Sequence, residues 1–264
     1  MAAISVENLT KKYGGTTALD GVNLQVNDGE LFGLLGVNGA GKTTLIKILS
    51  TLSLPTEGRA FVCGKEVVSE RSEVKRLIDL SPQETSVALN LTVRENLKFF
   101  AELYYPDRAE RDRVVEEIIS EFGLAEVIDK RAKTLSGGWQ RRLSIAVALV
   151  SHPRVLFLDE PTLGLDVFAR RDLWKIISKL KGKITVLLTS HYLEEIEALC
   201  DRVAILAKGK VVALGTVEEL ERRSGEKRFE DAFVKLVEEA EAKDNANGIT
   251  ATANGANADG EGQV

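Results

Sequence analysis

One short segment constrains this chain more than any other. Residues 36–44 read Gly-Val-Asn-Gly-Ala-Gly-Lys-Thr-Thr and match the pattern GxxxxGK[ST]. The segment follows the apolar run Leu31–Leu35, and its last two residues begin a stretch, 43–50, that we expect to be helical. Glycines here let backbone N–H groups converge on phosphate oxygens, and the helix N-terminus adds partial positive charge. The pattern therefore predicts an α/β fold with a nucleoside triphosphate site at the end of a strand.

This phosphate loop supplies most of the predicted ligands of ATP. Lys42 is expected to contact the β- and γ-phosphate oxygens, and the Thr43 hydroxyl is expected to ligate Mg²⁺. A plain glycine turn between strand and helix is the alternative, but it assigns no function to Lys42. The predicted nucleotide-binding residues of the loop are Gly36, Asn38, Gly39, Ala40, Gly41, Lys42, Thr43 and Thr44.

A second strand carries two carboxylates at its end. Residues 155–158 are apolar, and Asp159 and Glu160 follow them directly. Ligands of α/β proteins bind at the carboxyl ends of strands. We expect Asp159 to hold Mg²⁺ and Glu160 to be the general base or orienting group for the attacking water. A solvated cap is the alternative for an isolated acidic pair, and the phosphate loop weighs against it.

The remaining pattern predicts the fold class. The apolar runs 31–35, 155–158 and 184–188 each lead into a helix-like segment, which favours a parallel sheet covered by helices. Residues 2–30 and 58–80 have the pattern of short strands and turns. We therefore expect a P-loop NTPase core with a mostly parallel sheet, an antiparallel β subdomain and a helical subdomain.

The expected domain boundaries follow from composition. One ATPase domain is predicted over residues 1–243, with its helical subdomain at about 85–150 and a C-terminal helix at about 229–242. From residue 244 onward the chain is mostly Ala, Asn, Gly, Asp and Thr. Such a segment buries too little apolar surface to offset its ordering entropy, so 244–264 is predicted to be a disordered tail.

Composition also limits the partners and the compartment. The formal net charge is −5, which argues against nucleic acid as a main partner. There is no run of 18 apolar residues and no signal-peptide pattern, so we expect a cytoplasmic chain that acts at a membrane only through a partner. Cys63 and Cys200, the two cysteines, have no metal-ligand spacing and are expected to be small buried side chains.

A third motif lies between the phosphate loop and the two carboxylates. Ser136, Gly137 and Gly138 open a segment predicted to be helical through residue 150. A hydroxyl and free N–H groups at a helix start form an anion site, while a plain N-cap is the simpler interpretation. With the phosphate loop before it and Asp159 after it, the segment resembles the ATP-binding subunits of ABC transporters, over roughly residues 4–220.

The resemblance implies roles for further residues. Tyr13 matches the aromatic residue that stacks on adenine, with simple packing as the alternative. Gln83 matches the glutamine that touches Mg²⁺ and links the core to the helical subdomain. Asp166 matches a dimer-contact aspartate, and His191 matches the switch histidine near the γ-phosphate. The implied catalytic residues are Glu160, His191, Lys42 and Gln83, and the implied metal ligands are Thr43, Gln83 and Asp159.

The resemblance also implies partners. The segment Ser136-Gly-Gly reaches the γ-phosphate of ATP on an opposite subunit, so two subunits sandwich two ATP molecules. The partner is a second copy or a paired ATPase subunit, and separate transmembrane permease subunits complete a transporter at the inner face of the cell membrane. The surface 92–103 is expected to contact the permease. The resemblance is greatest to the multidrug and ABC-2-type exporter branch.

Two residues depart from the family's motifs, and several alternative functions stay open. Trp139 replaces a common glutamine and Val37 a frequent proline; neither change removes a phosphate ligand, but Trp139 removes any hydrogen bond of that glutamine. An importer ATPase stays possible. A DNA-repair ATPase is disfavoured because no long coiled coil separates the motifs, and a translation factor because only one cassette is present. Glu160 and His191 disfavour a nucleotide-binding module without enzymatic activity.

Overall fold

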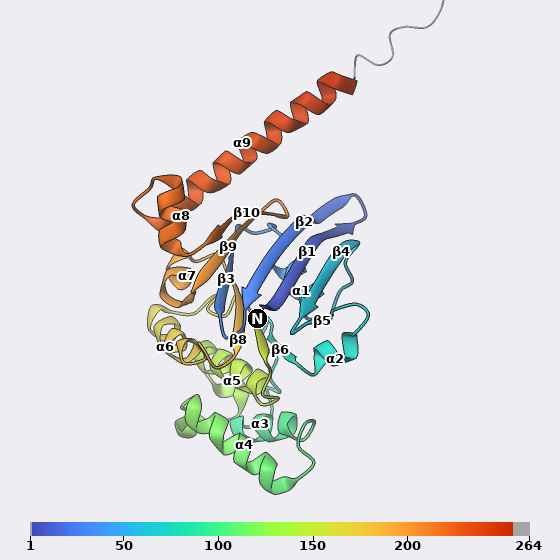
Figure 1. Ribbon diagram of the computed structural model, residues 1–264. Helices are drawn as coiled ribbons and strands as arrows, with labels where there is room; N and C mark the ends of the chain where they lie inside the picture. The colour runs from blue at the N-terminus through green and yellow to red at the C-terminus, as the bar shows by residue number, and fades with distance from the viewer. Residues whose placement is uncertain (1, 256–264) are drawn as a thin grey trace, which may run out of the picture.

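Six strands form the central sheet of the computed structural model, which describes the backbone of residues 2–255 and the side chains of residues 2–243 (Figure 1). Of the five pairs of neighbouring strands, four are parallel and one pair, at one edge of the sheet, is antiparallel. The mostly parallel sheet predicted from the apolar runs is confirmed. The strand order is β10 (Lys210–Gly215), β9 (Arg202–Ala207), β3 (Leu31–Leu35), β8 (Thr185–Ser190), β7 (Val155–Asp159) and β6 (Ile78–Ser81).

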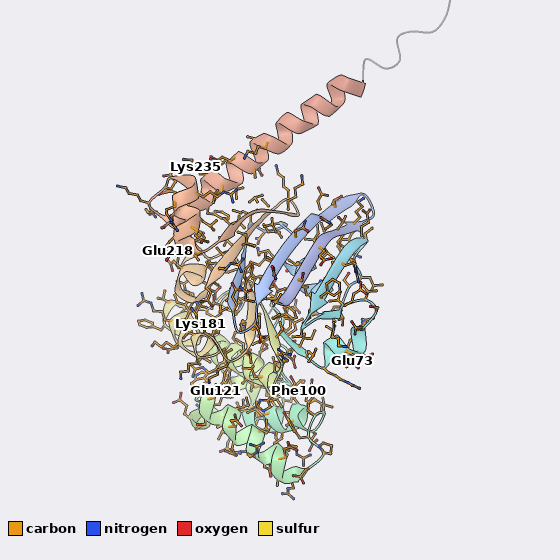
Figure 2. All side chains as sticks on the ribbon, viewed as in Figure 1. Glu73, Phe100, Glu121, Lys181, Glu218 and Lys235 are labelled. Carbon is orange, nitrogen blue, oxygen red and sulfur yellow. The ribbon has the colours of Figure 1, made fainter. Side chains whose placement is uncertain are left out.

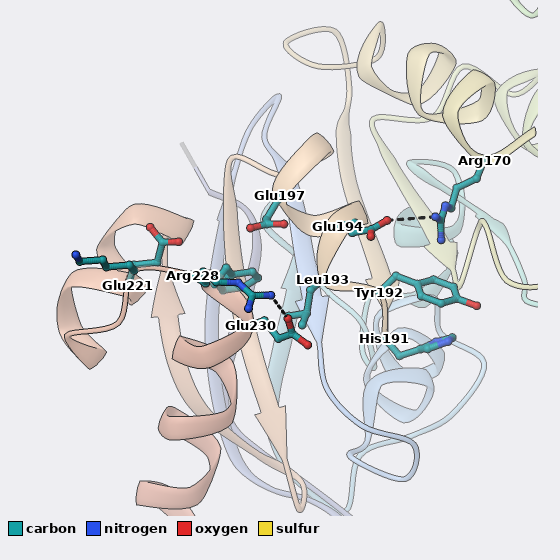
Figure 3. Close-up of a pocket in the computed structure, with 11 residues that line it drawn as sticks. Arg170, His191, Tyr192, Leu193, Glu194, Glu197, Glu221, Arg228 and Glu230 are labelled. Carbon is teal, nitrogen blue, oxygen red and sulfur yellow. Dashed lines mark hydrogen bonds and ion pairs between the residues drawn. The ribbon is translucent and has the colours of Figure 1, made fainter. Parts of the chain in front are cut away.

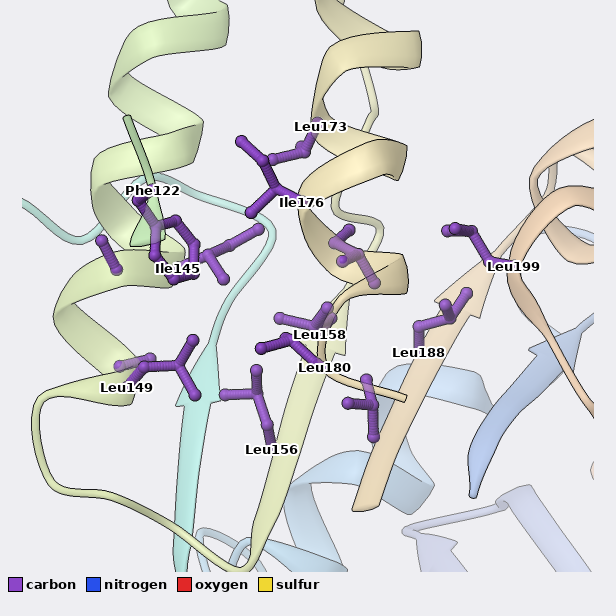
Figure 4. Close-up of a cluster of buried hydrophobic side chains, with 14 of the residues drawn as sticks. Phe122, Ile145, Leu149, Leu156, Leu158, Leu173, Ile176, Leu180, Leu188 and Leu199 are labelled. Atoms are coloured by element: carbon purple, nitrogen blue, oxygen red, sulfur yellow. The ribbon is translucent and has the colours of Figure 1, made fainter. Parts of the chain in front are cut away.

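Helices cover both faces of this sheet, so its inner strands are buried throughout. Successive side chains of a strand point to opposite faces. Accordingly, Leu156 and Leu158 of β7 pack in one apolar cluster, while Val155 and Phe157 pack in another. The first cluster also holds side chains of α5 (Gly137–Leu149), α6 (Val167–Ser178) and α7 (Leu193–Leu199) (Figure 4). The second holds those of α1 (Lys42–Leu49).

A four-stranded antiparallel sheet lies over the α1 face, as the strand and turn pattern predicted. Its order is β2 (Thr16–Asn27), β1 (Ala2–Tyr13), β4 (Glu57–Val62) and β5 (Lys65–Glu66). One short helix, α2 (Arg71–Lys75), lies within the range 58–80, where only strands and turns were expected. Its single buried residue, Val74, anchors it to the second apolar cluster.

The helical part follows β6 and extends below the core in Figure 1. It contains α3 (Val93–Ala101), α4 (Arg108–Glu121), the 3-10 turns Ala125–Val127 and Ala132–Thr134, and α5. A capping box between Thr92 and Glu95 starts α3, and the Asp107 side chain caps α4. Val114, Val115, Ile118 and Ile119 form an apolar face of α4 that is buried in the first apolar cluster.

The C-terminal helices α8 (Val217–Ser224) and α9 (Phe229–Gly255) follow β10, and α9 projects away from the sheet (Figure 1). Phe229, Ala232 and Leu236 anchor the start of α9 in the core. The sequence predicted that the helix ends near residue 242, with disorder from 244; the structure instead continues the helix through Gly255. A helix that has already formed can be extended without a second nucleation step. The composition of residues 244–255 alone does not show that a helix precedes them. Residues 256–264 of the predicted tail lie outside the described residues.

Within residues 2–255, no helix combines the length and the apolar character that crossing a membrane requires.

Candidate active site

The loop between β3 and α1 passes very close to neighbouring backbone. Gly39 and Gly41 have φ angles of 82° and 108°, in the region that favours glycine. A Cβ atom on Gly36 would lie 2.4 Å from the carbonyl oxygen of Leu206, and one on Gly41 would lie 2.5 Å from that of Ala18. The backbone path itself therefore requires glycine at these positions of the GxxxxGK[ST] pattern.

This loop borders a pocket of about 190 Å³ that is lined by four parts of the chain. Gly36 is not among the lining residues, but its carbonyl oxygen accepts a hydrogen bond from Lys42 Nζ at 2.6 Å. The structure thus gathers most of the predicted phosphate ligands with Gln83 and Glu160. The lining residues are Ala18, Asn38, Gly39, Ala40, Gly41, Lys42, Thr43, Thr44, Gln83 and Glu160.

Asp159 is held at the carboxyl end of β7, where β8 ends beside it. The register of the two strands pairs Asp159 with Thr189. The Thr189 hydroxyl donates to Asp159 Oδ1 at 2.6 Å and accepts a hydrogen bond from the Glu160 backbone N–H at 2.9 Å. From the first turn of α1, the Thr43 hydroxyl reaches the same Asp159 oxygen at 3.4 Å. Two strand ends and a helix start therefore fix this carboxylate.

Glu160 lies between a cation and an imidazole at the pocket. Its Oε1 is 3.4 Å from Lys42 Nζ, and its Oε2 is 2.6 Å from His191 Nδ1. The Glu160 backbone has a φ of 49°, a left-handed value that is strained for a residue other than glycine. Only 7% of the residue is exposed. The carboxylate is thus oriented from both sides, by Lys42 and His191, at the lining of the pocket.

The oxygen ligands at this point fit a Mg²⁺ ion that binds together with a nucleotide. Proteins commonly hold Mg²⁺ by one or two carboxylates, with substrate phosphates and water completing the shell. Asp159 and Thr43 supply such oxygens, and the exposed Gln83 lines the same pocket. The described residues contain no group of three His, Cys, Asp or Glu residues that could hold a metal by itself. Phosphate oxygens and water would complete the coordination of an ion held here.

Besides Gly36, the predicted nucleotide contacts Tyr13 and Ser136, Gly137 and Gly138 lie outside the pocket lining. Tyr13 ends β1 and is 48% exposed, with Lys11 Nζ 4.7 Å from the centre of its ring. Ser136 and Gly137 are exposed at the start of α5, and Ser136 makes no side-chain capping bond to that helix. Gly138 packs tightly on α6, since a Cβ atom there would lie 2.9 Å from that of Ala169. The Ser136 hydroxyl therefore does not cap α5, and its role as a ligand of the nucleotide stays a prediction.

His191 contacts Glu160 but does not line the phosphate pocket; it borders a second pocket, of about 510 Å³, between α7 and the start of α9 (Figure 3). Figure 3 shows Arg170 paired with Glu194 beside Tyr192. On α7, Glu195 is fully buried and accepts a hydrogen bond from Trp174 Nε1 at 3.1 Å. Burial raises the pKa of Glu195. The helix that follows His191 is thus fixed to α6 by a buried polar contact.

Arg141 is a residue of the site that the sequence did not single out. Its guanidinium donates to the backbone oxygens of Asp159 at 2.7 Å and Pro161 at 2.8 Å. It also donates to the oxygens of Pro82 and of Gln83, the latter at 3.2 Å. Burial lowers the pKa of Arg141 to about 10, so the group stays protonated at neutral pH. One side chain on α5 thus joins the segment of Gln83 to the end of β7.

A weak signal for this role exists in the sequence. Arg141 shares a helix face with Ser144, Ile145 and Ala148, which lie three, four and seven positions later and are buried. A charged residue on a buried face is unusual unless its charge is hydrogen-bonded. The adjacent Arg142 obscures this signal, because one sequence does not reveal which of two neighbouring arginines faces inward.

The geometry defines a class of site. A phosphate loop, a carboxylate beside the Thr43 hydroxyl and a second carboxylate held by Lys42 and His191 are the parts of a P-loop ATPase.

Comparison with known proteins identifies the family. Residues 19–163 match the family model described as ABC transporter. The chain is 42% identical over 229 residues to the daunorubicin resistance ATP-binding protein DrrA3 of Streptomyces coeruleorubidus, covering 86% of this chain and 72% of that protein. Its fold is similar to a solved ATP-binding subunit of an ABC transporter, with a TM-score of 0.78 and 30% identity over 89% of this chain and 99% of that one.

A second solved structure bears on the dimer. It is a dimeric post-hydrolysis state of the ATP-binding cassette MJ0796 bound to ADP and phosphate, with a TM-score of 0.72 and 27% identity. The match covers 81% of this chain and 98% of the MJ0796 chain. The chain therefore belongs to the ABC transporter family and is an ATP-binding, ATP-hydrolysing subunit of that family. The family predicted from the three motifs is confirmed.

Proposed function

We propose that this chain hydrolyses ATP to drive export across a membrane through separate permease subunits. The observation that carries the proposal is the Glu160 carboxylate, which is held between Lys42 and His191 at the phosphate pocket. A carboxylate at the γ-phosphate end of the pocket can accept the proton of the attacking water. Lys42 and His191 then stabilise the charge that develops on the transferred phosphoryl group. Similarity to a drug-resistance ATP-binding protein supports export over uptake.

The proposal assigns roles to the remaining site residues. Thr43, Asp159 and Gln83 would hold a Mg²⁺ ion, which would supply positive charge against the phosphates. Tyr13 would stack on the adenine ring, which its exposed position allows. Backbone N–H groups of the loop would bind the phosphates, and Ser136, Gly137 and Gly138 would contact the nucleotide of a partner subunit. The loop residues in this role are Gly36, Asn38, Gly39, Ala40, Gly41, Lys42, Thr43 and Thr44.

The proposal also places the chain in its assembly. Two ATPase subunits would form a head-to-tail dimer on the inner face of the cell membrane, on the cytoplasmic side. We propose that residues 1–243 form the ATPase domain, with a helical subdomain at about 85–150. The capped helices α3 and α4 lie within that range and support this division. Nucleic acid has no part in this function.

The substitution Glu160→Gln tests the proposal directly. The amide keeps the size of the side chain but cannot act as a general base. Steady-state ATP hydrolysis by the purified protein is expected to fall on the order of 10²–10³-fold, the loss typical for one preorganised catalytic group. ATP binding, measured with a fluorescent analogue, should stay near the wild-type level because the phosphate loop is untouched.

Glu57→Gln is the matched control, because Glu57 is an exposed carboxylate on β4 that does not line the pocket. It should hydrolyse ATP at the wild-type rate. Undiminished hydrolysis by the Glu160→Gln protein would remove Glu160 from the catalytic role and leave the proposed mechanism without its base.

A further inference from the structure

The imidazole of His191 is held at two points. Its Nδ1 lies 2.6 Å from Glu160 Oε2, and its ring centre lies 4.1 Å from the centre of the Tyr192 ring, with 40° between the two ring planes. Within the described part of the chain, His191 Nε2 makes no hydrogen bond. The last torsion of a histidine is broad, so one hydrogen bond alone leaves the ring plane loosely defined. The Tyr192 ring therefore restricts that plane and the direction of Nε2.

The Tyr192 ring is in turn in contact with Arg170, which projects from α6. The guanidinium carbon of Arg170 lies 5.4 Å from the centre of the Tyr192 ring and 5.4 Å from the centre of the Trp174 ring. An arginine at this distance from an aromatic ring is attracted by the ring electrons. Figure 3 shows the Tyr192 ring between the Arg170 guanidinium and the His191 imidazole. The imidazole is thus linked to α6 through one aromatic ring.

Several contacts hold Arg170 in this place. Its side chain is only 18% exposed, and its Nη2 lies 3.2 Å from Glu194 Oε2. Its Nε is buried and has no hydrogen-bond partner among the described residues. An unpaired buried donor costs free energy, so the ion pair and the two aromatic contacts must offset that cost. The Trp174 ring is itself fixed, because its Nε1 donates to the buried Glu195 carboxylate at 3.1 Å.

The location of these two side chains argues against a role in core packing alone. Tyr192 and Arg170 are only partly buried, and both line the pocket of about 510 Å³. Neither belongs to the two apolar clusters of the described chain. Their burial therefore contributes little to the hydrophobic stabilisation of the fold, which scales with the apolar area removed from water. Their closest functional neighbour is His191.

We infer that Tyr192 and Arg170 are positioning residues for ATP hydrolysis. The Arg170 guanidinium holds the Tyr192 ring, and this ring holds the His191 imidazole with Nδ1 at Glu160 and with Nε2 free for a phosphate oxygen. The inference rests on the proposed function and adds two residues that act through His191. Neither of them lines the phosphate pocket. Their loss should therefore slow turnover and leave nucleotide affinity to the intact phosphate loop.

The position of the imidazole can be observed directly by NMR. The chain has two histidines, so a His152→Gln variant identifies the His191 signals by elimination. Carbon-bound protons of His191 that lie close to the Tyr192 ring experience its ring current. In ¹H–¹³C spectra of the full chain, Tyr192→Leu should move these signals and Tyr192→Phe should leave them near their wild-type positions. Arg170→Gln should move them in the same direction as Tyr192→Leu, because the tyrosine ring loses its support.

Steady-state kinetics test the effect on the reaction. Tyr192→Leu is expected to lower kcat on the order of 10- to 100-fold, the scale for a misplaced catalytic group, with KM for ATP near wild type. Tyr192→Phe should retain the wild-type rate. Arg170→Gln should lower kcat by a smaller factor, and the double variant with Tyr192→Leu should lose no more than Tyr192→Leu alone.

Two exposed residues supply matched controls. Tyr104→Leu makes the same change at a half-exposed tyrosine beyond the end of α3, which lines a cavity together with Phe100 (Figure 2). Arg171→Gln makes the same change at an exposed arginine of α6. Neither residue lines the phosphate pocket or the pocket beside His191. Both variants should hydrolyse ATP at the wild-type rate.

A His191→Ala background separates positioning from a purely structural role. If Tyr192 acts through the imidazole, Tyr192→Leu should cause no further loss of kcat in this background. Denaturant unfolding monitors folding, and Arg170→Gln keeps the test informative if Tyr192→Leu fails to fold. Equal fold losses in both backgrounds, or wild-type kcat in Tyr192→Leu and Arg170→Gln, would overturn the inference and leave the proposed function intact. Undiminished hydrolysis by His191→Ala itself would instead overturn the catalytic role of His191 in the proposed function.

Discussion

At the scale of single residues, Arg141 combines contacts that no other residue type can supply. Its planar guanidinium presents five N–H donors in a fixed geometry, whereas a lysine presents one compact ammonium group. The four backbone oxygens that it binds belong to the segment of Gln83 and to the residues around Glu160. Arg141 is therefore a positioning residue, since it acts through the residues that face the nucleotide.

This assignment predicts a selective effect of Arg141→Lys. The ammonium cannot bind both segments at once, so the catalytic groups should shift relative to the phosphate loop. We expect kcat to fall on the order of 10- to 100-fold, which is the scale for misplaced catalytic groups, while KM for ATP stays near wild type. Steady-state kinetics separate the two parameters. Arg171→Lys, at an exposed arginine of α6, is the control. An equal effect on KM and kcat, or none on either, would contradict the positioning role.

The residues that could be predicted differ from Arg141 in a physical way. The phosphate loop is a run of neighbours, so its chemistry is visible in local spacing, and Asp159 and Glu160 are marked by the strand that precedes them. The contacts of Arg141 join residues about 20 and 60 positions away in the sequence, and only the folded chain brings them together.

At the scale of elements, the site depends on how three strand ends and their loops align. The ends of β3, β7 and β8 lie in one register, which pairs Leu35 with Ser190 and Asp159 with Thr189. The sequence predicted these strands because each is a continuous apolar run bounded by turn residues. It could not predict the length of α9, because the helix continues beyond its apolar positions into a segment of weak helix-forming composition. Propagation of an existing helix is decided by what precedes the segment.

The loop between β3 and α1 gives a prediction at this scale. Gly41→Ala adds a Cβ atom 2.5 Å from the Ala18 oxygen at a φ of 108°, so the loop must move. Left-handed strain and overpacking together should lower the free energy of unfolding by about 2–5 kcal/mol and prevent ATP binding. Gly64→Ala is the matched control, with a φ of 78° and no atom near the added Cβ. It should lose only about 1–2 kcal/mol from strain and should bind ATP normally. Denaturant unfolding and nucleotide titration measure both quantities.

Equal effects of the two alanine substitutions would show that only the left-handed backbone conformation at these glycines affects the free energy of unfolding and ATP binding. The close approach of the loop to β2 would then have no role in shaping the phosphate site.

At the scale of the whole molecule, the proposed ligands of the nucleotide lie at two separate places on one subunit. Lys42 lines the phosphate pocket, whereas Ser136 is exposed at the start of α5 and is not part of that lining. A symmetric head-to-tail dimer brings such separated surfaces together, because each copy supplies its first surface to one site and its second surface to the other. The exposed residues Leu163 and Phe168, near the start of α6, have exposed fractions of 40% and 83% and would be covered in such a dimer.

This arrangement predicts complementation between two inactive variants. Lys42→Ala and Ser136→Glu each damage both sites of their own homodimer, so each protein alone should hydrolyse little ATP. In a mixed dimer, one site carries both defects and the other carries none. If the variants associate at random in an equal mixture and the two sites act independently, roughly one quarter of the wild-type rate should return on mixing, because half of the dimers are mixed and each has one intact site. The rate is measured with both proteins above their dimerisation concentration.

The control for this mixing experiment is a pair of defects within one surface, Lys42→Ala with Glu160→Gln. These two residues are 3.4 Å apart in one pocket, so every site of the mixed dimer contains at least one defect. No activity should return, because neither subunit can supply an intact pocket to either site. Recovery with Ser136→Glu but not with Glu160→Gln would establish that Ser136 acts on the nucleotide of the partner subunit. Absence of recovery in both mixtures would place Ser136 in the site of its own subunit, and the head-to-tail dimer would then be wrong for this chain.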